Sequence, residues 1–416
     1  MGFWGEARGL DERDGVKGVR GEFLGVGGGV VYLDGNSLGR VSSGVRGGVV
    51  RVLGEWEGDV VEGWHGWLGV GREAGGFIGR VVGAEEGEVV LSDSTSVNLY
   101  KLAVAAVEMQ KGRGRDVIVV DRDDFPTDRY VLEGVARERG VEVRWVQGGI
   151  DEGVGVGDVE RVMDGRVGLV CLSHVAYRSG AVADIRGITE VVHRHGGMVL
   201  WDLCHSAGAI EVGLAEANVD LAVGCTYKYL NGGPGAPAFL YVRRDLQDVL
   251  VQPIHGWFGQ TDQFAMGDVY EPPKAIERFL VGTPPILSGV AALEGARISA
   301  RVGIGPIAEK ARALTGFALK LTDAWLTPLG FRVASPRAAE RRGAHLTLHH
   351  PQAWQMCQAL KAAKVIPDYR PPERLRLGFA PLYTRFEDVY TGLSRLRDIA
   401  AEGRHLTYPA VPRGLT

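Results

Sequence analysis

Between about residues 88 and 245, short apolar runs alternate with stretches whose apolar residues recur at helical spacing. The apolar runs predict six buried strands, at residues 116–121, 141–146, 166–175, 198–204, 221–227 and 238–242. The stretches between them predict helices at residues 95–110, 127–140 and 184–197. This alternation indicates an α/β fold in which helices cover both faces of a mostly parallel sheet. Ligands of such folds bind at the carboxyl ends of the strands.

The pattern also predicts three parts of the chain. A long helix at residues 290–303 leads out of the large domain, and glycine becomes rarer after it. We expect an N-terminal segment (1–55) that packs with the small domain, a large ligand-binding domain (56–300) and a smaller α+β C-terminal domain (301–416).

The composition excludes several classes of function. The net charge is -4, so neither a nucleic-acid surface nor attraction to an anionic membrane is indicated. No apolar run reaches the roughly 18 residues that a membrane-spanning helix needs. The four cysteines lack metal-binding spacing, which is typical of reduced thiols in a cytoplasmic protein. His349 and His350 form an isolated pair with no third ligand nearby, so we expect no metal site.

Glycine is unusually frequent, at 62 of 416 residues, about twice the usual share of roughly 7%. Several glycines, including Gly47, Gly54 and Gly58, fall in a predicted helix, where each costs up to ~1 kcal/mol relative to alanine. The run GVGGGV at 25–30 has the composition of a dinucleotide-binding loop. It precedes VVYLDGNSLG instead of opening a helix after a strand, so we expect a flexible turn.

Lys228 ends a predicted strand and precedes a loop rich in glycine and proline. A lone lysine in this position is most often a solvated surface group. A rigid strand end can also deliver a lysine amine to an aldehyde cofactor as a Schiff base. Asp202 ends the preceding strand, where a carboxylate is costly to bury without a partner. A carboxylate facing the ring nitrogen of pyridoxal phosphate keeps that nitrogen protonated, so the pair favours a pyridoxal-phosphate site. His205 is a structural histidine, a hydrogen-bond partner of Asp202 or a group that stacks on the ring.

Hydroxyl side chains gather at the start of the predicted helix in SDSTSVNLYKL (92–102). We expect Asp93 or Ser94 to be the N-cap. The free amides of that helix end, together with Thr95 and Ser96, make a candidate phosphate site.

Two residues of DRDDFPTDRYV (121–131) could extend this site. Phe125 stands at a strand end, where an aromatic ring either packs in the core or stacks on a flat cofactor. Asp128 either caps the next helix or joins the network that faces the ring.

Taken together, these motifs resemble those of the kynureninases, which are aspartate-aminotransferase-like (fold type I) pyridoxal-phosphate enzymes. YLDGNSLG, DFPTD and TYKYLNGGPGAP are the most specific strings, whereas residues 304–370 and those before residue 30 match only in general character. The matching strings run in order over nearly the whole chain: YLDGNSLG (32–39), DSTSVNLYKL (93–102), DFPTDRY (124–130), LSHVAYRSG (172–180), WDLCHSAGA (201–209), CTYKYLNGGPGAP (225–237), HGWFGQ (255–260), FLVGTPPILSG (279–289) and RLGFAPLY (376–383).

The resemblance implies a large pyridoxal-phosphate-binding domain with a smaller C-terminal domain, and it implies a role for each site residue. Lys228 would form the Schiff base and Asp202 would pair with the pyridine nitrogen. Tyr227 would hold the phosphate, relay a proton near the substrate ketone, or do both. The implied cofactor-binding residues are Thr95, Ser96, Phe125, Pro126, Thr127, Asp128, Ser173, Asp202, His205, Tyr227 and Lys228, with Trp257 and Thr283 reaching the cofactor from the neighbouring subunit.

Arg376 matches the arginine that binds the substrate α-carboxylate, a task suited to a bidentate guanidinium. Asn36 and Ser37 belong to the same implied substrate pocket. Trp64 and Gly282, with Thr283, match the bacterial form of the pocket, which favours kynurenine over 3-hydroxykynurenine.

The implied reaction is the hydrolytic cleavage of the Cβ–Cγ bond of L-kynurenine, and of 3-hydroxy-L-kynurenine. The products are anthranilate, or 3-hydroxyanthranilate, and L-alanine. We expect a cytoplasmic homodimer that acts in tryptophan catabolism. The sequence does not distinguish a role in degradation from one in NAD biosynthesis or in secondary metabolism.

Two alternatives stay open at this point. A cysteine desulfurase-like enzyme of the same fold needs a reactive cysteine on a mobile loop after Lys228, where the only cysteine is Cys357, in a predicted helix. A non-catalytic cofactor-binding regulator would need a DNA-binding extension, and no basic helix-turn-helix stretch is present.

Overall fold

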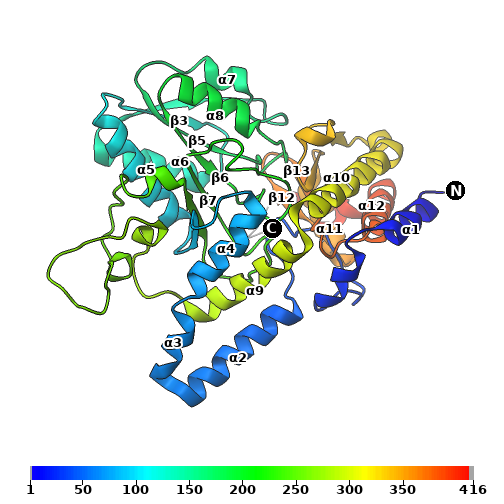
Figure 1. The fold of residues 1–416 in the computed structure, drawn as a ribbon. Coiled ribbons are helices and arrows are strands. Elements are labelled where there is room, and N and C mark those ends of the chain that lie inside the picture. The colour runs from blue at the N-terminus through cyan, green and yellow to red at the C-terminus, as the bar shows by residue number, and fades with distance from the viewer. Residues whose placement is uncertain (1, 412–416) are drawn as a thin grey trace.

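A seven-stranded sheet forms the centre of the larger part of the molecule (Figure 1) in the computed structural model, which describes residues 2–411. Its spatial order is β2-β8-β7-β6-β5-β3-β4, and all neighbouring strands are parallel except for the two antiparallel pairs that β8 makes. The mostly parallel sheet is therefore confirmed. The six predicted strands correspond to β3 to β8, whereas the short β2 was not predicted. The strands are β2 (Val89–Leu91), β3 (Val117–Asp121), β4 (Glu142–Val146), β5 (Val167–Ser173), β6 (Met198–Asp202), β7 (Leu221–Gly224) and β8 (Phe239–Val242).

Helices cover both faces of this sheet. Successive residues of a strand point to opposite faces, and in these strands the residues on both faces are apolar, so both faces must be buried. In β3, Val119 belongs to the core on one face, and Ile118 and Val120 belong to the core on the other. The first face is covered by α4 (Val70–Val82), α7 (Val156–Glu160), α8 (Ile185–Arg194) and α9 (Ile286–Val302), and the second by α5 (Thr95–Lys111) and α6 (Pro126–Arg139).

A smaller α+β unit follows α9, as predicted. Its antiparallel sheet has the order β12-β13-β10-β9. Its core joins Leu346 and Leu348 of the sheet to Leu314 and Leu393 of the covering helices. The elements are α10 (Ile304–Leu321), β9 (Arg332–Val333), β10 (His345–His349), α11 (Ala353–Ala362), β12 (Asp368–Arg370), β13 (Arg374–Gly378) and α12 (Phe386–Ala401).

The N-terminal residues complete this smaller unit. β1 (Val31–Tyr32) pairs in parallel with β11 (Val365–Ile366). α1 (Phe3–Arg13) packs on α12, and the two carboxylate oxygens of Asp11 accept hydrogen bonds from the first two amides of α12, at 2.8 and 3.0 Å. The next helix, α2 (Ser43–Asp59), packs on α9 and is followed by α3 (Trp64–Trp67). The predicted domain limit at residue 55 therefore falls inside α2, and the three-part division stays a prediction.

Short helical turns connect these elements. None of the helices in residues 2–411 is long and apolar enough to cross a membrane. The 3-10 turns lie at Lys17–Glu22, Val60–Gly63, Arg244–Leu246, Trp257–Gly259, Ile276–Phe279, Thr327–Leu329, Ala339–Arg341 and Arg404–Thr407, and a π turn lies at Thr322–Leu326.

The glycines in helices are of two kinds. A Cβ on Gly75 of α4 would lie 2.2 Å from the carbonyl oxygen of Val89, so the close approach of helix and strand requires glycine there. A Cβ on Gly47, Gly54 or Gly58 of α2 would meet nothing within 4 Å. Packing therefore explains only part of the high glycine content.

Candidate active site

Lys228 is held in place by the backbone of the turn that follows β7. Its carbonyl oxygen accepts a hydrogen bond from the amide of Asn231. The hydroxyl of Thr226 closes the turn with a hydrogen bond of 2.6 Å to the carbonyl oxygen of Pro237. Gly39 packs against this turn from the N-terminal segment, because its amide donates to the carbonyl oxygen of Tyr227 at 2.8 Å. The lysine is thus carried on a fixed turn that begins where β7 ends at Gly224, whereas the sequence predicts a strand that continues to residue 227.

Asp202 ends β6, the strand next to β7, and is 6% exposed. Its Oδ1 accepts a hydrogen bond of 2.6 Å from the amide of Cys204. Asp128, in the first turn of α6, is 1% exposed and contacts Asp202. Burial, followed by the negative charge of Asp202, raises the pKa of Asp128 well above its usual range. The Oδ2 atom of Asp128 has no hydrogen-bond partner within residues 2–411.

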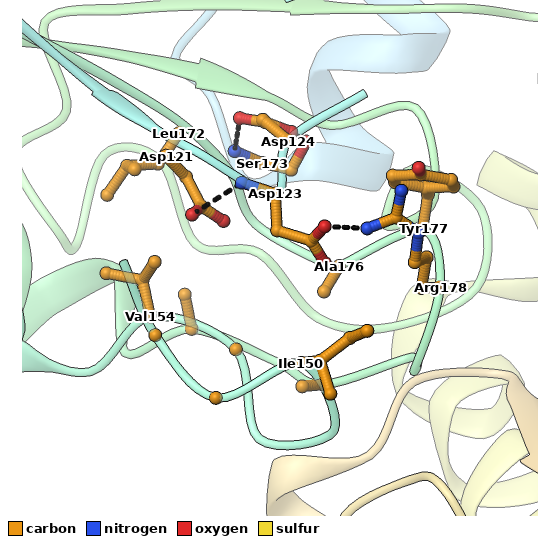
Figure 2. Close-up of a pocket in the computed structure, with 15 residues that line it drawn as sticks. Asp121, Asp123, Asp124, Ile150, Val154, Leu172, Ser173, Ala176, Tyr177 and Arg178 are labelled. Atoms are coloured by element: carbon orange, nitrogen blue, oxygen red, sulfur yellow. Dashed lines mark hydrogen bonds and ion pairs between the residues drawn. The ribbon is translucent and has the colours of Figure 1, made fainter. Parts of the chain in front are cut away.

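Ser173 ends β5 and binds Asp124, a residue that the sequence analysis did not select. The Ser173 hydroxyl donates to Oδ1 of Asp124 at 2.5 Å, and the Ser173 amide donates to Oδ2 at 3.1 Å. Burial, followed by the charge of Asp121, raises the pKa of Asp124 to about 7. Figure 2 shows these residues around a cavity of about 20 Å³, with the ion pair of Asp123 and Arg178 on another wall. That volume is enough for about one water molecule.

The N-terminus of α5 has the features of an anion site. Ser94 is the N-cap, since its hydroxyl accepts from the amide of Val97 at 3.4 Å. The amides of Thr95 and Ser96 donate no hydrogen bond within the described part of the chain. The Thr95 hydroxyl lies 3.7 Å from the sulfur of Cys204, so this helix end lies beside the end of β6.

His205 lies beside Lys228, and no hydrogen bond joins it to Asp202 within residues 2–411. Its Nε2 is 3.4 Å from the lysine Nζ, and its ring lies 5.7 Å from that of His345, a residue that the sequence analysis did not select. Burial, followed by the charge of Lys228, lowers the pKa of His205 well below its usual range. The imidazole therefore stays neutral at physiological pH.

Two aromatic side chains border the site. Phe125 is 42% exposed and meets the ring of Tyr177 edge-on at 5.4 Å, so it is not packed in the core. Pro126 and Thr127 follow it as the first residues of α6. The lysine Nζ lies 5.8 Å from the centre of the Tyr227 ring, and burial raises the pKa of the Tyr227 hydroxyl.

Arg376 of β13 is the centre of a buried polar cluster. The guanidinium, 2% exposed, forms an ion pair with Asp368, its register partner on β12. Its Nη1 donates to the carbonyl oxygen of Tyr177 at 2.6 Å, and its Nη2 donates to the hydroxyl of Ser37 at 3.1 Å. With its amide oxygen turned toward the guanidinium, Asn36 accepts from Nε at 2.8 Å. Asn36, Ser37 and Arg376 are thus brought together, as predicted.

Four predicted residues lie elsewhere. Trp64 and Thr283 line an open apolar groove of about 660 Å³ between α2, α3 and the start of α9. Gly282 and Thr283 also line a smaller cavity beside Asp93, and Trp257 is 41% exposed. Figure 1 shows α3 at the far end of the large domain from the small sheet.

Several residues of the site were not selected from the sequence. Tyr177 and Asp124 lie inside matched strings but were not selected, and a test for buried carboxylates at strand ends would have found Asp124. Asp368 and His345 belong to the stretch with only general resemblance, and Gly39 acts through its backbone alone.

Comparison with known proteins gives relatives that extend over nearly the whole chain. A family model described as the kynureninase C-terminal domain matches residues 307–396. The chain is 39% identical over 401 residues to the kynureninase of Burkholderia pseudomallei (strain 1106a), covering 95% of this chain and 94% of that protein. It is 38% identical over 397 residues to the kynureninase of Pseudomonas fluorescens, covering 94% of each.

Solved structures show the fold. The apo structure of a cysteine desulfurase from Thermococcus onnurineus NA1 has a TM-score of 0.79 at 20% identity, over 93% of this chain and 98% of that one. A mutant of C-DES with glycine covalently linked to its pyridoxal-phosphate cofactor has a TM-score of 0.78 at 16% identity, over 91% and 99%. The predicted fold, that of fold type I pyridoxal-phosphate enzymes, is confirmed by these likenesses, which at such identities show the fold alone.

Proposed function

Since this chain belongs to the kynureninase family, we propose that it is a pyridoxal-phosphate-dependent hydrolase that cleaves the Cβ–Cγ bond of L-kynurenine to give anthranilate and L-alanine. The observation that carries the proposal is the placing of Lys228 in the turn after β7 and of Asp202 at the end of the adjacent strand β6, together with a helix N-terminus that has free amides and a buried arginine cluster.

The residues present fit this cofactor. Asp202 and Asp128 bring two carboxyl groups into one buried place, and Oδ2 of Asp128 lacks a partner within residues 2–411. Two buried carboxyl groups favour a neighbouring positive charge and a hydrogen-bond donor, and a protonated pyridine nitrogen supplies both. The free amides of Thr95 and Ser96 suit the phosphate. Lys228 is the amine that would hold the aldehyde, and Phe125, which is exposed, is free to stack on the ring.

Bound there, pyridoxal phosphate supplies an electron sink for the carbon atoms next to the substrate amine. Lys228, as a free amine, takes the proton from Cα of the substrate. His205, whose pKa is lowered, stays uncharged beside it and is too weak a base to compete for that proton. Tyr227, whose pKa is raised, keeps its proton and can donate it to the ketone oxygen as water adds.

Arg376 orients the substrate by binding its α-carboxylate. Its guanidinium is already fixed by Asp368, Tyr177 and Ser37, so little side-chain freedom remains to be lost when the carboxylate binds. Asn36 and Ser37 of the N-terminal segment contact the same guanidinium and would therefore lie beside the substrate carboxylate.

We further propose a homodimer in which Trp64, Trp257, Gly282 and Thr283 serve the partner's site. The support is that Trp64 and Thr283 line an open apolar groove that exposes Trp56, by 57%, and Val61, by 68%. Gly282 lines a neighbouring cavity with Thr283, and Trp257 is 41% exposed. Contiguous apolar surface of this kind marks interaction sites. Because Trp64, Gly282 and Thr283 match the bacterial pocket, we expect kynurenine to be preferred over 3-hydroxykynurenine.

A place in the cytoplasm is part of the proposal, since all four cysteines are free and buried. A desulfurase-like activity is not favoured. Cys357 lies within α11, is fully buried, and has its pKa raised to about 12 by burial. A nucleophilic thiol needs exposure and a low pKa.

The test is to incubate the purified protein with L-kynurenine and to measure anthranilate by fluorescence and L-alanine by a coupled assay. Equimolar products, lost in Lys228→Ala, are expected. Release of sulfide from L-cysteine without any anthranilate from kynurenine would replace the proposal by the desulfurase-like alternative. Light scattering during size-exclusion chromatography checks the dimer, and a fully active monomer contradicts it.

A further inference from the structure

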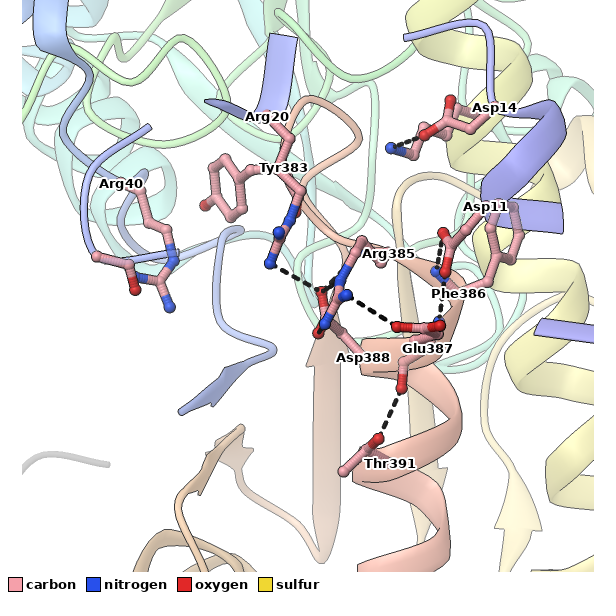
Figure 3. A network of polar contacts seen from close by, with 12 residues as sticks. Asp11, Asp14, Arg20, Arg40, Tyr383, Arg385, Phe386, Glu387, Asp388 and Thr391 are labelled. Carbon is pink, nitrogen blue, oxygen red and sulfur yellow. Dashed lines mark hydrogen bonds and ion pairs between the residues drawn. The ribbon is translucent and has the colours of Figure 1, made fainter. Parts of the chain in front are cut away.

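A second polar cavity, of about 200 Å³, lies between the glycine-rich turn at residues 25–30 and the start of α12. Four arginines line it, and Asp388 is the one acidic side chain among its lining residues. Figure 3 shows two of these arginines, Arg20 and Arg385, close together, with Arg40 facing them from the N-terminal segment. The fourth, Arg395, comes from the next turns of α12.

The positive charge of this cavity is only partly neutralised. Arg385 is paired with Glu387 and Asp388, at 2.8 and 2.9 Å, and Arg20 shares Asp388 at 3.8 Å. Burial lowers the pKa of Arg20, and Arg385 and Arg40 lower it further, against the effect of Asp388. The arginines thus repel one another, as expected where a counter-ion is needed.

The other two arginines have no carboxylate partner within residues 2–411. Arg40 donates to the carbonyl oxygen of Gly25 at 3.2 Å and lies 5.0 Å from the centre of the Tyr32 ring. Arg395 donates to the carbonyl oxygen of Ala363 at 2.8 Å. Each bond uses one of the five N–H groups of a guanidinium, so most donors are left for a ligand.

The turn adds backbone donors on the remaining side. φ is positive at Gly25 (72°), Gly27 (89°) and Gly29 (77°) and is not positive at the two residues between them. Alternation between right-handed and left-handed residues is the backbone pattern of concave anion sites, in which successive amides point to one side, and the alternating sign of φ is compatible with it. The amides of residues 26–30 donate no hydrogen bond within the described chain. The turn is therefore not merely a flexible connection, because its glycines face a cationic cavity.

We propose that this cavity is a binding site for a phosphate group, either free or carried by a small phosphate monoester. A tetrahedral dianion has oxygens for several converging guanidinium and amide groups, whereas a planar carboxylate is best served by one bidentate arginine. The site lies outside the Lys228 cluster. Its ligand would join the turn and Arg40 of the N-terminal segment to Arg385 and Arg395 of α12.

The experiment is calorimetric titration of the cofactor-loaded protein with inorganic phosphate, at constant ionic strength, with malonate and chloride as comparison anions. Saturable one-site binding of phosphate is expected, together with a thermal midpoint that rises with phosphate concentration. Arg40→Gln and Arg395→Gln should each weaken binding roughly tenfold, the effect of losing one charge-assisted hydrogen bond. The exposed Arg404→Gln, at the end of the same domain, serves as the control and should bind as the wild type does.

Two results would overturn the proposal. One is the absence of saturable phosphate binding, or binding of malonate tighter than that of phosphate. The other is unchanged phosphate affinity in both Arg40→Gln and Arg395→Gln, since the bound phosphate would then lie elsewhere, for instance at Arg376. Each variant is first checked for a wild-type thermal midpoint without phosphate. The two substitutions are on different segments, so one remains informative if the other destabilises the fold.

Discussion

The hydroxyl of Ser37 accepts a hydrogen bond of 3.1 Å from Nη2 of Arg376 and donates one of 3.3 Å to Asp368. One small side chain of the N-terminal segment thus completes the buried ion pair of β12 and β13. The proposed substrate carboxylate site is therefore built from segments that are far apart in the sequence.

Arg376→Lys should raise KM for L-kynurenine about 10- to 100-fold, because a lysine cannot reproduce the planar donor pattern that Asp368 and Tyr177 hold in place. Ser37→Ala should raise it less, by about threefold to tenfold. Steady-state kinetics measure both, with the visible absorbance of the bound cofactor as a control that should not change. An unchanged KM in Arg376→Lys would remove this residue from the substrate site.

Asp202→Asn and Asp128→Asn should differ sharply although the two carboxyl groups are in contact. The raised pKa of Asp128 favours its protonated form, whose hydrogen-bond donor asparagine reproduces, so kcat should stay within about threefold. Asparagine at position 202 removes a charge that typically shifts the pKa of a neighbour by 1–3 units. We expect kcat to fall about 10- to 1000-fold while cofactor is retained. Equal losses in the two variants would show that the roles are not divided in this way.

Asp124→Asn should change how the stability of the apoprotein depends on pH. The folded-state pKa of Asp124 is raised to about 7 from an ordinary value of 3.8, so between these values the folded state holds a proton that the unfolded state has lost. This contribution to stability is present at about pH 4 and is lost as the pH rises to about 7, by up to about 1.4 kcal/mol per pH unit.

Relative to the variant, the wild type should therefore become less stable from about pH 4 to 7 and change no further above that. Thermal midpoints of the two proteins across this range give the comparison. Subtracting the variant cancels the opposite contribution of the buried neutral His174 and His205, whose pKa values are lowered. A constant difference between the two proteins would contradict the prediction.

Gly39→Ala should weaken cofactor binding about tenfold or more without altering any side chain of the site. Its Cβ would lie 2.3 Å from the carbonyl oxygen of Lys228 and 2.4 Å from Oδ1 of Asn231, so the turn that carries the lysine must shift. Titration of the apoprotein with pyridoxal phosphate, followed by absorbance, measures the effect. Gly47→Ala, where the added carbon meets nothing within 4 Å, is the matched control and should bind normally.

Gly134→Ala in α6 and Gly316→Ala in α10 should each stabilise the protein by up to about 1 kcal/mol, because their added carbons meet nothing within 4 Å. Gly75→Ala should destabilise it, since its Cβ would lie 2.2 Å from the Val89 carbonyl oxygen. Thermal denaturation should show increases of about 1–3 °C for the first two and a decrease for the third. The opposite ranking would mean that helix propensity does not limit stability here.

The sequence predicts the parts of this structure that depend on local pattern. β3 to β8 were recognisable because each is an apolar run between amphipathic helices. Lys228 and Asp202 were recognisable only as a pair, because a carboxylate at the end of a buried strand is costly without a partner. β2 was missed, since three apolar residues without flanking alternation do not stand out from a helix end.

What the sequence could not predict depends on pairing between distant segments. Asp368 is near Arg376 only because β12 and β13 are antiparallel with these residues in register. Burial, and then the negative charges of Asp121 and Asp202, raise the pKa of Asp124. These three carboxyl groups come together from the ends of two strands, β3 and β6, that are separate in the sequence. Trp64 and Trp257 cannot be placed at a site from one chain, because no contact among residues 2–411 brings them to Lys228.

The capping of α12 by Asp11, with the pairing of β1 and β11, bears on how the protein is made. These contacts join segments that are synthesised early to segments that are synthesised more than 300 residues later. The large sheet can assemble during synthesis, since domains generally fold as units in the order of translation. α1 and β1 therefore have no partner until α12 and β11 have been synthesised. The proposed active site is therefore completed late in synthesis, and loss of either α1 or α12 should leave the smaller unit incomplete.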